Sequence, residues 1–351
     1  MKALLLVGGK GTRLRPLTVH TPKSIVPIFN RPFLTYQIEL LKQIPDIDEV
    51  ILSLNYQPRR IEEMFGDGRD LGIKLRYVVE PAPLGTAGAV RYAGESLTDS
   101  VVVFNGDVLA QIDLAAVLAR HQQRKALATI VLTPVPNPSA YGLVETDAEG
   151  NVQRFVEKPK PEDITCDTIN AGIYVLEPST FDRIPRDTAW SIERSFFPDL
   201  IARGETFVSY VSRGYWIDIG TPEKYVTVHR DIMNGLYVAA PFGAACRTRT
   251  VVEPGARVEP GAELTGPVYV DEGAVIKAGA RIGPYTVVGR HCHVAEGAAV
   301  EGSILWPNTR IAEGARVRDS VLGRACFVGH DAALDGCILG DKSEITEFSR
   351  L

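Results

Sequence analysis

The sequence has little cysteine, no long apolar run and no excess of positive charge. Five cysteines lie scattered through 351 residues, which is not the pattern of a disulfide-rich secreted protein and favours a reducing, cytoplasmic location. No stretch approaches the roughly 18 apolar residues of a membrane span, so we expect no membrane association. With 38 basic against 43 acidic residues the net charge is −5, so no basic field is present to hold nucleic acid.

The remaining composition is that of an ordinary globular protein with room for two domains. Apolar residues make up 45% of the chain, which is enough for sizeable cores. The amino-terminal apolar run, residues 3–7, is short and a glycine-rich stretch follows it. We therefore expect no secretory signal.

Short apolar segments alternate with helix-length segments from residue 1 to about 235. The pattern predicts strands at 3–7, 49–54, 75–79 and 101–105, and helices at 33–44, 58–65, 86–97 and 114–124. This order is typical of a parallel sheet with helices on both faces. Further strands at 141–146, 152–156 and 169–176, and one helix at 192–203 capped by Ser191, predict that mixed strands extend the sheet.

A repeat of six residues replaces this pattern after about residue 251. Aliphatic residues recur at every sixth position from Val252 to Val300, and small residues stand two positions before most of them. After Val300 steps of 11 and 6 residues alternate, and Ser303, Ser320 and Cys337 keep the resulting spacing of 17. Such hexads predict a three-sided parallel β-helix, here with five to six coils. We therefore predict an α/β domain at 1–235, a linker at 236–250 and a β-helix at 251–351.

A glycine-rich turn follows the first predicted strand. Gly8, Gly9 and Gly11 let backbone N–H groups approach an anion, at the carboxyl edge of the sheet where ligands bind in such folds. Arg13 and Lys23 follow closely, and Thr12 adds a hydroxyl group. The spacing is neither that of a P-loop nor that of a dinucleotide fingerprint. The turn therefore predicts a nucleotide-phosphate site of another kind.

Six segments, in chain order, resemble the sugar-1-phosphate nucleotidyltransferases. They are GGKGTRLRPLTVHTPKSIVP (8–27), LGTAG (84–88), NGDVL (105–109), FVEKP (155–159), INAGIYVL (169–176) and WIDIGTPEKY (216–225). The hexapeptide repeats match as well, and the similarity is greatest to the mannose-1-phosphate guanylyltransferases. The resemblance implies a Rossmann-like nucleotidyltransferase domain with a mixed, mainly parallel sheet, followed by a left-handed parallel β-helix.

The resemblance also implies the reaction. A sugar 1-phosphate attacks the α-phosphorus of a nucleoside triphosphate, giving a nucleotide sugar and pyrophosphate. The family's catalytic residues correspond to Arg13, Lys23, Asp107, Lys158 and Asp218. Asp107 follows a buried strand and Asp218 lies far along the chain, and the family brings the two together. Two carboxylates suit Mg²⁺, although either aspartate alone could be a cap or a turn residue.

Nucleotide binding is assigned by the same resemblance. It involves Leu6, Gly8, Gly9, Gly11, Thr12, Arg13, Glu80, Gly85, Thr86 and Asp107. Glu80 stands where uridylyl- and thymidylyl-transferring relatives have a glutamine. A carboxylate only accepts hydrogen bonds, and guanine presents two adjacent donors, so Glu80 favours GTP. The alternative is that Glu80 is a solvated charge at the end of a strand.

The sugar phosphate is expected at Gly142, Glu157, Lys158 and Asn170. Nothing in these residues separates mannose from glucose, so a glucose-1-phosphate uridylyl- or thymidylyltransferase remains an alternative. A non-catalytic regulatory homologue is a second alternative. A bifunctional enzyme with an acyltransferase centre at His291, His293 or His330 is a third.

The surfaces of the solenoid favour a homo-oligomer. His291-Cys292-His293 has no third ligand nearby in sequence and predicts no metal site.

Overall fold

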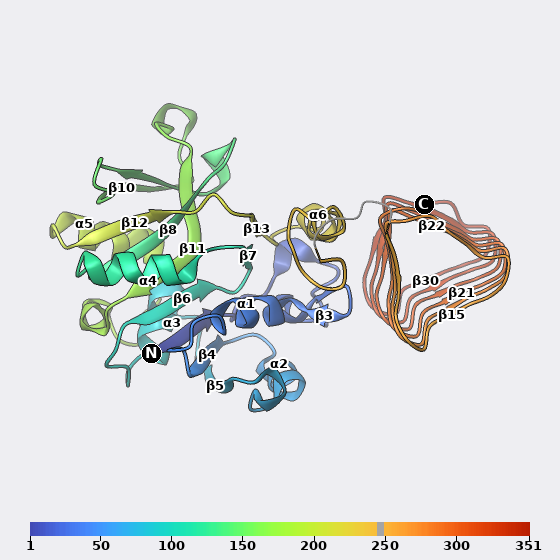
Figure 1. Ribbon diagram of the computed structural model, residues 1–351, viewed down its shortest axis with the longest axis horizontal. Coiled ribbons are helices and arrows are strands. Elements are labelled where there is room, and N and C mark those ends of the chain that lie inside the picture. Colours follow the sequence, from blue (N-terminus) through green and yellow to red (C-terminus); the bar gives the residue numbers. More distant parts are fainter. Residues whose placement is uncertain (244–248) are drawn as a thin grey trace. The chain divides into compact units, whose positions relative to one another are not determined.

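The computed structural model describes residues 1–243 and 249–351. The chain divides into two compact units, the first formed by Met1–Lys10 and Leu34–Asp218 and the second by Gly11–Phe33 and Ile219–Leu351. Figure 1 labels the elements of each. These bounds differ from the predicted domains, because residues 11–33 and 219–235 group with the hexad region. Part of the predicted linker, residues 244–248, lies outside the described residues.

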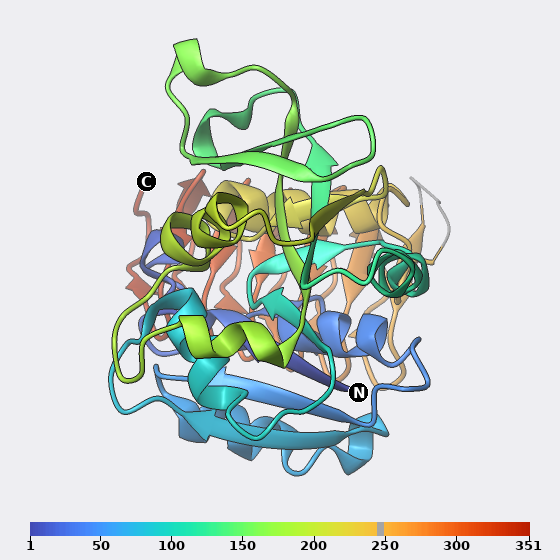
Figure 2. The same cartoon turned by 90° about the vertical axis from the view of Figure 1, so that its left-hand side faces the viewer.

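The first unit is built on a mixed sheet in the order β10-β9-β11-β6-β1-β4-β5. Its parallel part consists of β1 (Lys2–Leu6), β4 (Glu49–Leu54), β5 (Lys74–Val79) and β6 (Val101–Asn105). The antiparallel part consists of β9 (Gly142–Thr146), β10 (Val152–Glu157) and β11 (Thr168–Leu176). Two strands not foreseen, β8 (Ala128–Pro134) and β12 (Phe207–Val211), pair off this path. The predicted parallel sheet with mixed extensions is confirmed, and β9 and β10 stand at one edge of it (Figure 2).

Helices connect these strands at the expected places. They are α1 (Phe33–Leu41), α2 (Pro58–Phe65), α3 (Gly85–Ala93), α4 (Leu114–Gln123) and α5 (Phe197–Ala202), with short 3₁₀ turns at Arg69–Leu71, Pro138–Ala140, Pro161–Asp163 and Pro178–Arg183. A π-helical turn, η7 (Ile192–Phe196), precedes α5. The predicted cap Ser191 is confirmed, since its Oγ accepts hydrogen bonds from the N–H groups of Glu193 (3.2 Å) and Arg194 (3.1 Å).

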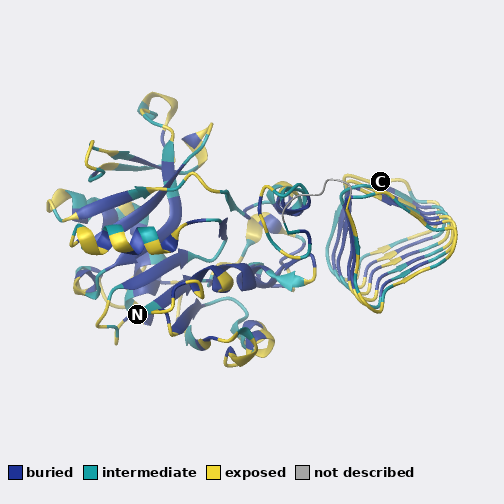
Figure 3. Ribbon diagram, viewed as in Figure 1, coloured by how far each residue is buried: buried dark blue, intermediate teal, exposed yellow. Residues whose placement is uncertain are grey.

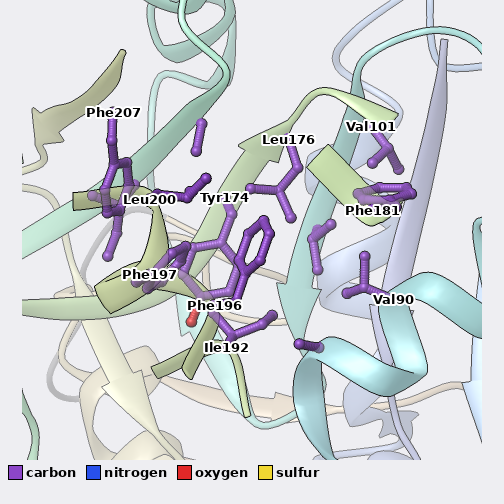
Figure 4. Close-up of a cluster of buried hydrophobic side chains, with 14 of the residues drawn as sticks. Val90, Val101, Tyr174, Leu176, Phe181, Ile192, Phe196, Phe197, Leu200 and Phe207 are labelled. Atoms are coloured by element: carbon purple, nitrogen blue, oxygen red, sulfur yellow. The ribbon is translucent and has the colours of Figure 1, made fainter. Parts of the chain in front are cut away.

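Aromatic packing holds α5 against the sheet. Phe197 contacts Tyr174 on β11 and Phe207 on β12, with ring centroids 5.2 and 4.8 Å apart. These residues and Phe196 belong to one buried cluster (Figure 4). Figure 3 shows that the strands of the central sheet are the most deeply buried part of the unit. Burial of large apolar side chains is the main driving force that fixes this scaffold.

The second unit contains the parallel β-helix predicted from the hexads, with three sheets of six, six and five strands (Figure 1). The first sheet is β14 (Thr250–Val252), β17 (Val268–Val270), β20 (Thr286–Val288), β23 (Ile304–Leu305), β26 (Val321–Leu322) and β29 (Ile338–Leu339). The second is β15 (Arg257–Val258), β18 (Val275–Ile276), β21 (His293–Val294), β24 (Arg310–Ile311), β27 (Phe327–Val328) and β30 (Glu344–Ile345). The third is β16 (Glu263–Leu264), β19 (Arg281–Ile282), β22 (Ala299–Glu301), β25 (Arg316–Arg318) and β28 (Ala333–Asp335).

The predicted change of spacing is visible in the register. Val270 pairs with Val288, 18 residues on, whereas Val288 pairs with Leu305, 17 residues on. Ser303 and Ser320 mark this step with hydrogen bonds. The Ser303 Oγ accepts the N–H of Ser320, and the Ser320 Oγ accepts the N–H of Cys337, each at 3.0 Å. The spacing of 17 residues is therefore fixed by a column of side chains as well as by the strands.

The inward positions of the hexads form one core, with an exception at the first coil. Val270, Ile276 and Ile282 are buried, whereas Val252 is 43% exposed. Val252 lies on β14, the edge strand of its sheet, so no earlier coil covers it. The core of a solenoid forms only between stacked coils.

The second unit also holds residues 11–33, which include Gly11, Thr12 and Arg13 of the predicted phosphate turn. This segment contains the 3₁₀ turns η1 (Thr12–Leu14) and η2 (Lys23–Ile25) and the strands β2 (Pro27–Ile28) and β3 (Arg31–Pro32), and α6 (Pro222–Met233) packs against it. The hydroxyl group of Tyr225 donates to the Pro27 carbonyl and accepts from Trp306 Nε1 at 2.9 Å. Hydrogen bonds therefore tie the segment through α6 to the β-helix.

Within the described parts of the chain, every helix is too short or too polar to cross a membrane.

Candidate active site

The predicted glycine turn begins at the carboxyl end of β1. A Cβ atom on Gly8 would lie 3.1 Å from the Cβ of Asn55, just beyond β4, so this position has little room for a larger residue. Gly9 is exposed and a Cβ there would meet nothing within 4 Å. The Leu6 carbonyl accepts the N–H of Gly106 at 2.9 Å. Leu6 and Gly8 therefore lie where the ends of β1, β4 and β6 meet.

Glu80 is buried next to this turn. The side chain is 8% exposed, Oε1 accepts from Ser53 Oγ, and Oε2 accepts from the Leu84 N–H, each at 3.0 Å. Oε1 also lies 3.4 Å from the place a Gly8 Cβ would take. The alternative of a solvated charge is therefore wrong, because two donors draw the carboxylate inward. Each oxygen keeps a lone pair for one further donor.

Gly85 begins α3 in a conformation that only glycine adopts easily. Its φ is +69°, and a Cβ atom would lie 2.7 Å from the carbonyl oxygen of Trp190. The same oxygen accepts the N–H groups of Ala87 (2.9 Å) and Gly88 (3.2 Å). These two amides at the helix start are therefore used inside the fold. The backbone N–H groups of Ala87 and Gly88 are therefore not offered to a ligand, which leaves Gly85 and Thr86 as the residues of this helix start in the predicted nucleotide-binding set.

The hydroxyl group of Thr86 has protein partners as well. It donates to Glu193 Oε2 at 2.9 Å and accepts the N–H of Ile192 at 2.8 Å. Glu193 also accepts from Ser191 Oγ at 2.7 Å. Thr86 therefore ties α3 to η7 through its side chain, a role that sequence reasoning did not foresee.

Asp107 and Asp218 are brought together by a two-stranded ladder. Asp107 lies just before β7 (Val108–Ala110), which pairs antiparallel with β13 (Trp216–Asp218), and Asp218 stands opposite Val108. Gly106 makes the turn before Asp107, where a Cβ atom would lie 2.5 Å from the Leu6 carbonyl oxygen. Both aspartates are partly buried. The two carboxylates thus arise one register step apart, at the end of the central strand β6.

Asp218 is oriented by aromatic neighbours. The Tyr141 hydroxyl donates to Asp218 Oδ1 at 3.1 Å. The ring of Tyr141 packs edge-on against Trp216 at 5.5 Å, and Trp216 Nε1 donates to the Ala171 carbonyl at 2.9 Å. These contacts connect β13 to β11 and to the residue before β9. Tyr141 and Trp216 are supporting residues whose contacts sequence reasoning missed.

The donor set at Asp107 and Asp218 fits a hard divalent cation. The described residues contain no cluster of three or more histidine, cysteine or acidic side chains that could hold a metal, so at most two carboxylates serve here. Ions of this type often take one or two carboxylates and complete their coordination with water and phosphate oxygens. The Cys292 thiol points inward and donates to the Trp306 carbonyl at 3.1 Å.

The predicted sugar-phosphate residues gather around the β9–β10 pair. Gly142 lies opposite Glu157, and a Cβ atom on Gly142 would lie 3.1 Å from Glu157 Oε2. Burial, reinforced by the negative charge of Glu193, raises the pKa of Glu157, against the opposing effect of Lys158 and Arg194. Lys158 has a φ of 53°, and its N–H donates to the Tyr141 carbonyl at 2.9 Å. The same Cβ atom would lie 2.6 Å from Cζ of Phe155, so glycine at position 142 allows the Phe155 ring and the half-buried Glu157 carboxyl group to pack closely against this strand.

Asn170 lies on β11 beside a polar cluster that the sequence did not reveal. Its Nδ2 donates to the Tyr174 hydroxyl, and its Oδ1 accepts the N–H of Gly172, both at 2.8 Å. Burial first, and then the charge of Glu193, raises the pKa of Tyr174 well above its usual value. The β11–β8 register shifts between Asn170 and Tyr174. Asn170 itself still pairs with Leu132, so the irregular stretch lies between it and Tyr174.

The remaining predicted residues lie together in the second unit. Gly11 has a φ of 59°, and a Cβ atom there would lie 3.0 Å from the Cβ of Lys23. Thr18 Oγ1 donates to the Gly11 carbonyl at 2.6 Å and closes the turn. Thr12 and Arg13 are exposed on η1. Glycine at position 11 therefore permits the close packing of the turn against Lys23.

Comparisons with known proteins show the family to which the chain belongs. The family described as nucleotidyl transferase matches residues 2–235, and the GMPPB C-terminal domain matches residues 264–350. The mannose-1-phosphate guanylyltransferase of Mycobacterium tuberculosis (strain ATCC 25618 / H37Rv) is 40% identical over 89% of this chain and 81% of its own length. The probable mannose-1-phosphate guanylyltransferase 1 of Oryza sativa subsp. japonica is 38% identical over 92% and 86%. A UTP–glucose-1-phosphate uridylyltransferase of Synechocystis sp. (strain ATCC 27184 / PCC 6803 / Kazusa) is 32% identical over 92% and 87%.

Solved structures match about two thirds of the chain. The crystal structure of HddC from Yersinia pseudotuberculosis is 28% identical, with a TM-score of 0.58, over 66% of this chain and 99% of that chain. The same protein complexed with GMP-PN matches over the same shares with a TM-score of 0.56. The chain therefore belongs to the nucleotidyl transferase family, and it is an enzyme that transfers a nucleoside monophosphate from a nucleoside triphosphate to a sugar 1-phosphate.

Proposed function

We propose that this enzyme uses GTP and mannose 1-phosphate and forms GDP-mannose and pyrophosphate. The observation that carries the proposal is the buried carboxylate of Glu80 beside Gly8. Guanylyltransferases are among the relatives, and HddC from Yersinia pseudotuberculosis has been crystallised with GMP-PN. These similarities support a guanine nucleotide as the donor.

The hydrogen-bond polarity of Glu80 matches guanine. Guanine presents N1–H and an exocyclic amine side by side, and both need acceptors. Glu80 already accepts one bond on each oxygen, from Ser53 and from the Leu84 N–H, and both oxygens can accept one more. Uracil and thymine present an acceptor beside a donor, which a carboxylate cannot satisfy. A buried carboxylate therefore favours guanine and disfavours both pyrimidines.

The triphosphate is proposed to lie over the glycine turn. Gly8, Gly9, Gly11, Thr12 and Arg13 lie in one short stretch of the chain, residues 8–13. This continuity supports the proposal that they bind the same nucleotide. Leu6, Gly85, Thr86 and Asp107 complete the proposed nucleotide-binding set. Arg13 and Lys23 would neutralise the charge that develops as pyrophosphate leaves. Fixed cations at such a position lower the barrier of a reaction that needs no protein nucleophile.

Asp107 and Asp218 are proposed to hold Mg²⁺, which would polarise the α-phosphate and screen its negative charge. The Tyr141 hydroxyl keeps Asp218 in place for this purpose. Lys158 would bind the attacking phosphate group of the sugar, and Gly142, Glu157 and Asn170 would contact the sugar hydroxyl groups. The protein thereby orients the attacking oxygen in line with the leaving pyrophosphate.

The test is a pyrophosphate-release assay with five nucleoside triphosphates, each combined with mannose, glucose and glucosamine 1-phosphates. The proposal expects the highest kcat/KM with GTP and mannose 1-phosphate, and no turnover without a divalent cation. Faster turnover with UTP or dTTP and glucose 1-phosphate would favour the uridylyl- or thymidylyltransferase alternative. The 32% identical relative in Synechocystis, a UTP–glucose-1-phosphate uridylyltransferase, is the reason to include this pair of substrates.

Three further expectations concern the cellular setting, the oligomeric state and the acyltransferase alternative. A reducing, cytoplasmic setting is proposed because the four cysteines among the described residues, Cys166, Cys292, Cys326 and Cys337, are all free thiols. A homo-oligomer is proposed because a solenoid exposes strand edges at its ends. An acyltransferase centre gains no support at His330, whose Nδ1 is 2.8 Å from the Glu313 carbonyl oxygen and whose ring packs against Phe348.

A further inference from the structure

A buried amide in α1 spans the turn that carries Asp107. The side chain of Gln37 is 2% exposed, and its Nε2 donates to the carbonyl oxygens of Asn105 (2.9 Å) and Val108 (2.8 Å). Asn105 is the last residue of β6 and Val108 is the first of β7. Both hydrogens of one NH₂ group are therefore used to close the turn around Gly106 and Asp107.

The orientation of this amide follows from its partners. Both neighbours of Nε2 are carbonyl oxygens, which only accept, so a flipped amide would place Oε1 against these two acceptors. The other atom, Oε1, is buried and has no hydrogen-bond partner among the described residues. A buried acceptor without a partner lowers stability. Packing of α1 alone therefore does not account for a glutamine at position 37.

The two bonds fix both proposed metal ligands at once. The Asn105 bond and the bond from the Gly106 N–H to Leu6 hold the entry to the turn. The Val108 bond holds the residue that stands opposite Asp218 in the β7–β13 pair. A shift of Val108 would therefore displace both aspartates, Asp107 because it is bonded to Val108 and Asp218 because it pairs with Val108 in the ladder.

We propose that Gln37 is a positioning residue that sets the separation of the Asp107 and Asp218 carboxylates for one divalent cation. The inference rests on the proposed function in assigning the cation to these two residues. Gln37 itself touches no substrate. Residues that orient metal ligands without contacting the metal typically change metal affinity about 10- to 100-fold when replaced.

The test measures Mn²⁺ binding directly, by electron paramagnetic resonance, with the full chain and a GTP analogue that cannot release pyrophosphate. Gln37→Met keeps the length of the side chain and removes both donors, and we expect its Mn²⁺ Kd to rise about 10-fold or more. Thr35→Val in the same helix also replaces a buried polar group by an apolar one and should leave the Kd unchanged. Wild-type Mn²⁺ affinity in Gln37→Met overturns the inference.

Two further variants make the result decisive. If Gln37→Met does not fold, Gln37→Asn takes its place, because it stays polar but is too short to reach both carbonyl groups. The same loss of Mn²⁺ affinity is then expected, and wild-type affinity overturns the inference. Asp107→Asn separates this inference from the proposed function. If Asp107→Asn binds Mn²⁺ like the wild type, the metal assignment itself is wrong. If Asp107→Asn binds weakly while the Gln37 variants bind normally, only the role of Gln37 is wrong.

Discussion

Asp218 stands opposite Val108 across the β7–β13 ladder. Because Asp107 directly precedes Val108, the backbones of Asp107 and Asp218 are one register step apart. The two segments are more than a hundred residues apart in the chain, and each strand has three residues. Antiparallel neighbours are held about 5 Å apart at their Cα atoms. This small ladder therefore brings two distant carboxylates to the same end of β6.

The first prediction concerns these two carboxylates. Asp107→Asn and Asp218→Asn should each reduce kcat about 100-fold or more, because each replaces a charged ligand by a neutral amide of the same shape. Pyrophosphate release at saturating substrate measures the effect. Raising the Mn²⁺ concentration should restore part of the activity. Activity within about 3-fold of the wild type in either variant would be incompatible with a shared metal site.

The second prediction concerns base selection. In Glu80→Gln the amide oxygen can take the Leu84 N–H while the NH₂ group faces Ser53 Oγ, so the fold should tolerate the change. The amide offers guanine one acceptor fewer, and it offers uracil a matching donor and acceptor. We expect the ratio of kcat/KM for GTP to that for UTP to fall about 100-fold. An unchanged ratio would remove Glu80 from base recognition.

The third prediction concerns the ionisation of Glu157. Burial and the nearby charge of Glu193 raise the pKa of Glu157, so the native protein disfavours the ionised carboxylate. The ionised form therefore lowers stability at pH values above this raised pKa, and the cost disappears as pH falls below the ordinary pKa of a glutamate. Glu157→Gln should thus raise the Tm at pH 8 relative to the wild type, and less so at pH 4.

The same variant separates a structural role from a role in binding. If Glu157 accepts hydrogen bonds from the sugar, Glu157→Gln should raise the KM for the sugar 1-phosphate more than the KM for the nucleotide. Equal effects on both KM values, or none, would show that Glu157 does not contact the sugar. A Tm difference that is the same at pH 4 and pH 8 would contradict the direction of the pKa shift.

The fourth prediction concerns acid stability. His229 Nδ1 is 2.9 Å from the Tyr225 carbonyl oxygen, and Nε2 accepts the N–H of Phe29 at 3.2 Å. These partners require a neutral ring with its proton on Nδ1, and burial lowers the pKa of His229 from 6.5 to about 4. The unfolded chain binds this proton first as pH falls, so stability should decline between about pH 6.5 and 4.

The expected loss from this single group is ~3 kcal/mol, which urea unfolding at a series of pH values measures. The His229→Gln variant has no imidazole, so its stability should depend less on pH in this window. Equal slopes in the two proteins would contradict a buried neutral imidazole.

The fold was largely accessible from the sequence, because its signals are periodic and local. The apolar run at Val101–Asn105 and the cap at Ser191 are confirmed in the structure. The hexads likewise predict the coils, since an aliphatic residue recurs at every sixth position from Val252 to Val300 and a spacing of 17 residues continues the pattern. Val252 is exposed because it lies in the first coil. The hexad pattern is the same in every coil, so it does not predict this difference.

The site was less accessible, because its supporting contacts are not periodic. The pairing of Val108 with Asp218 joins strands too short to show alternation. The hydroxyl of Thr86 and the amide of Gln37 are committed to partners that only the folded chain brings near. Glu80 illustrates the same limit, since its burial depends on Ser53 and Leu84. A single polar residue in an apolar strand, as at Ser53, is the one signal that could have indicated a partner.

The most direct measurement is a crystal structure with Mn²⁺ and a GTP analogue that cannot release pyrophosphate, with the metal located by its anomalous scattering. The account predicts one Mn²⁺ bound by oxygens of both Asp107 and Asp218 and by the α-phosphate, with the guanine edge against Glu80. A metal held by neither aspartate, or a guanine base away from Glu80, would contradict it.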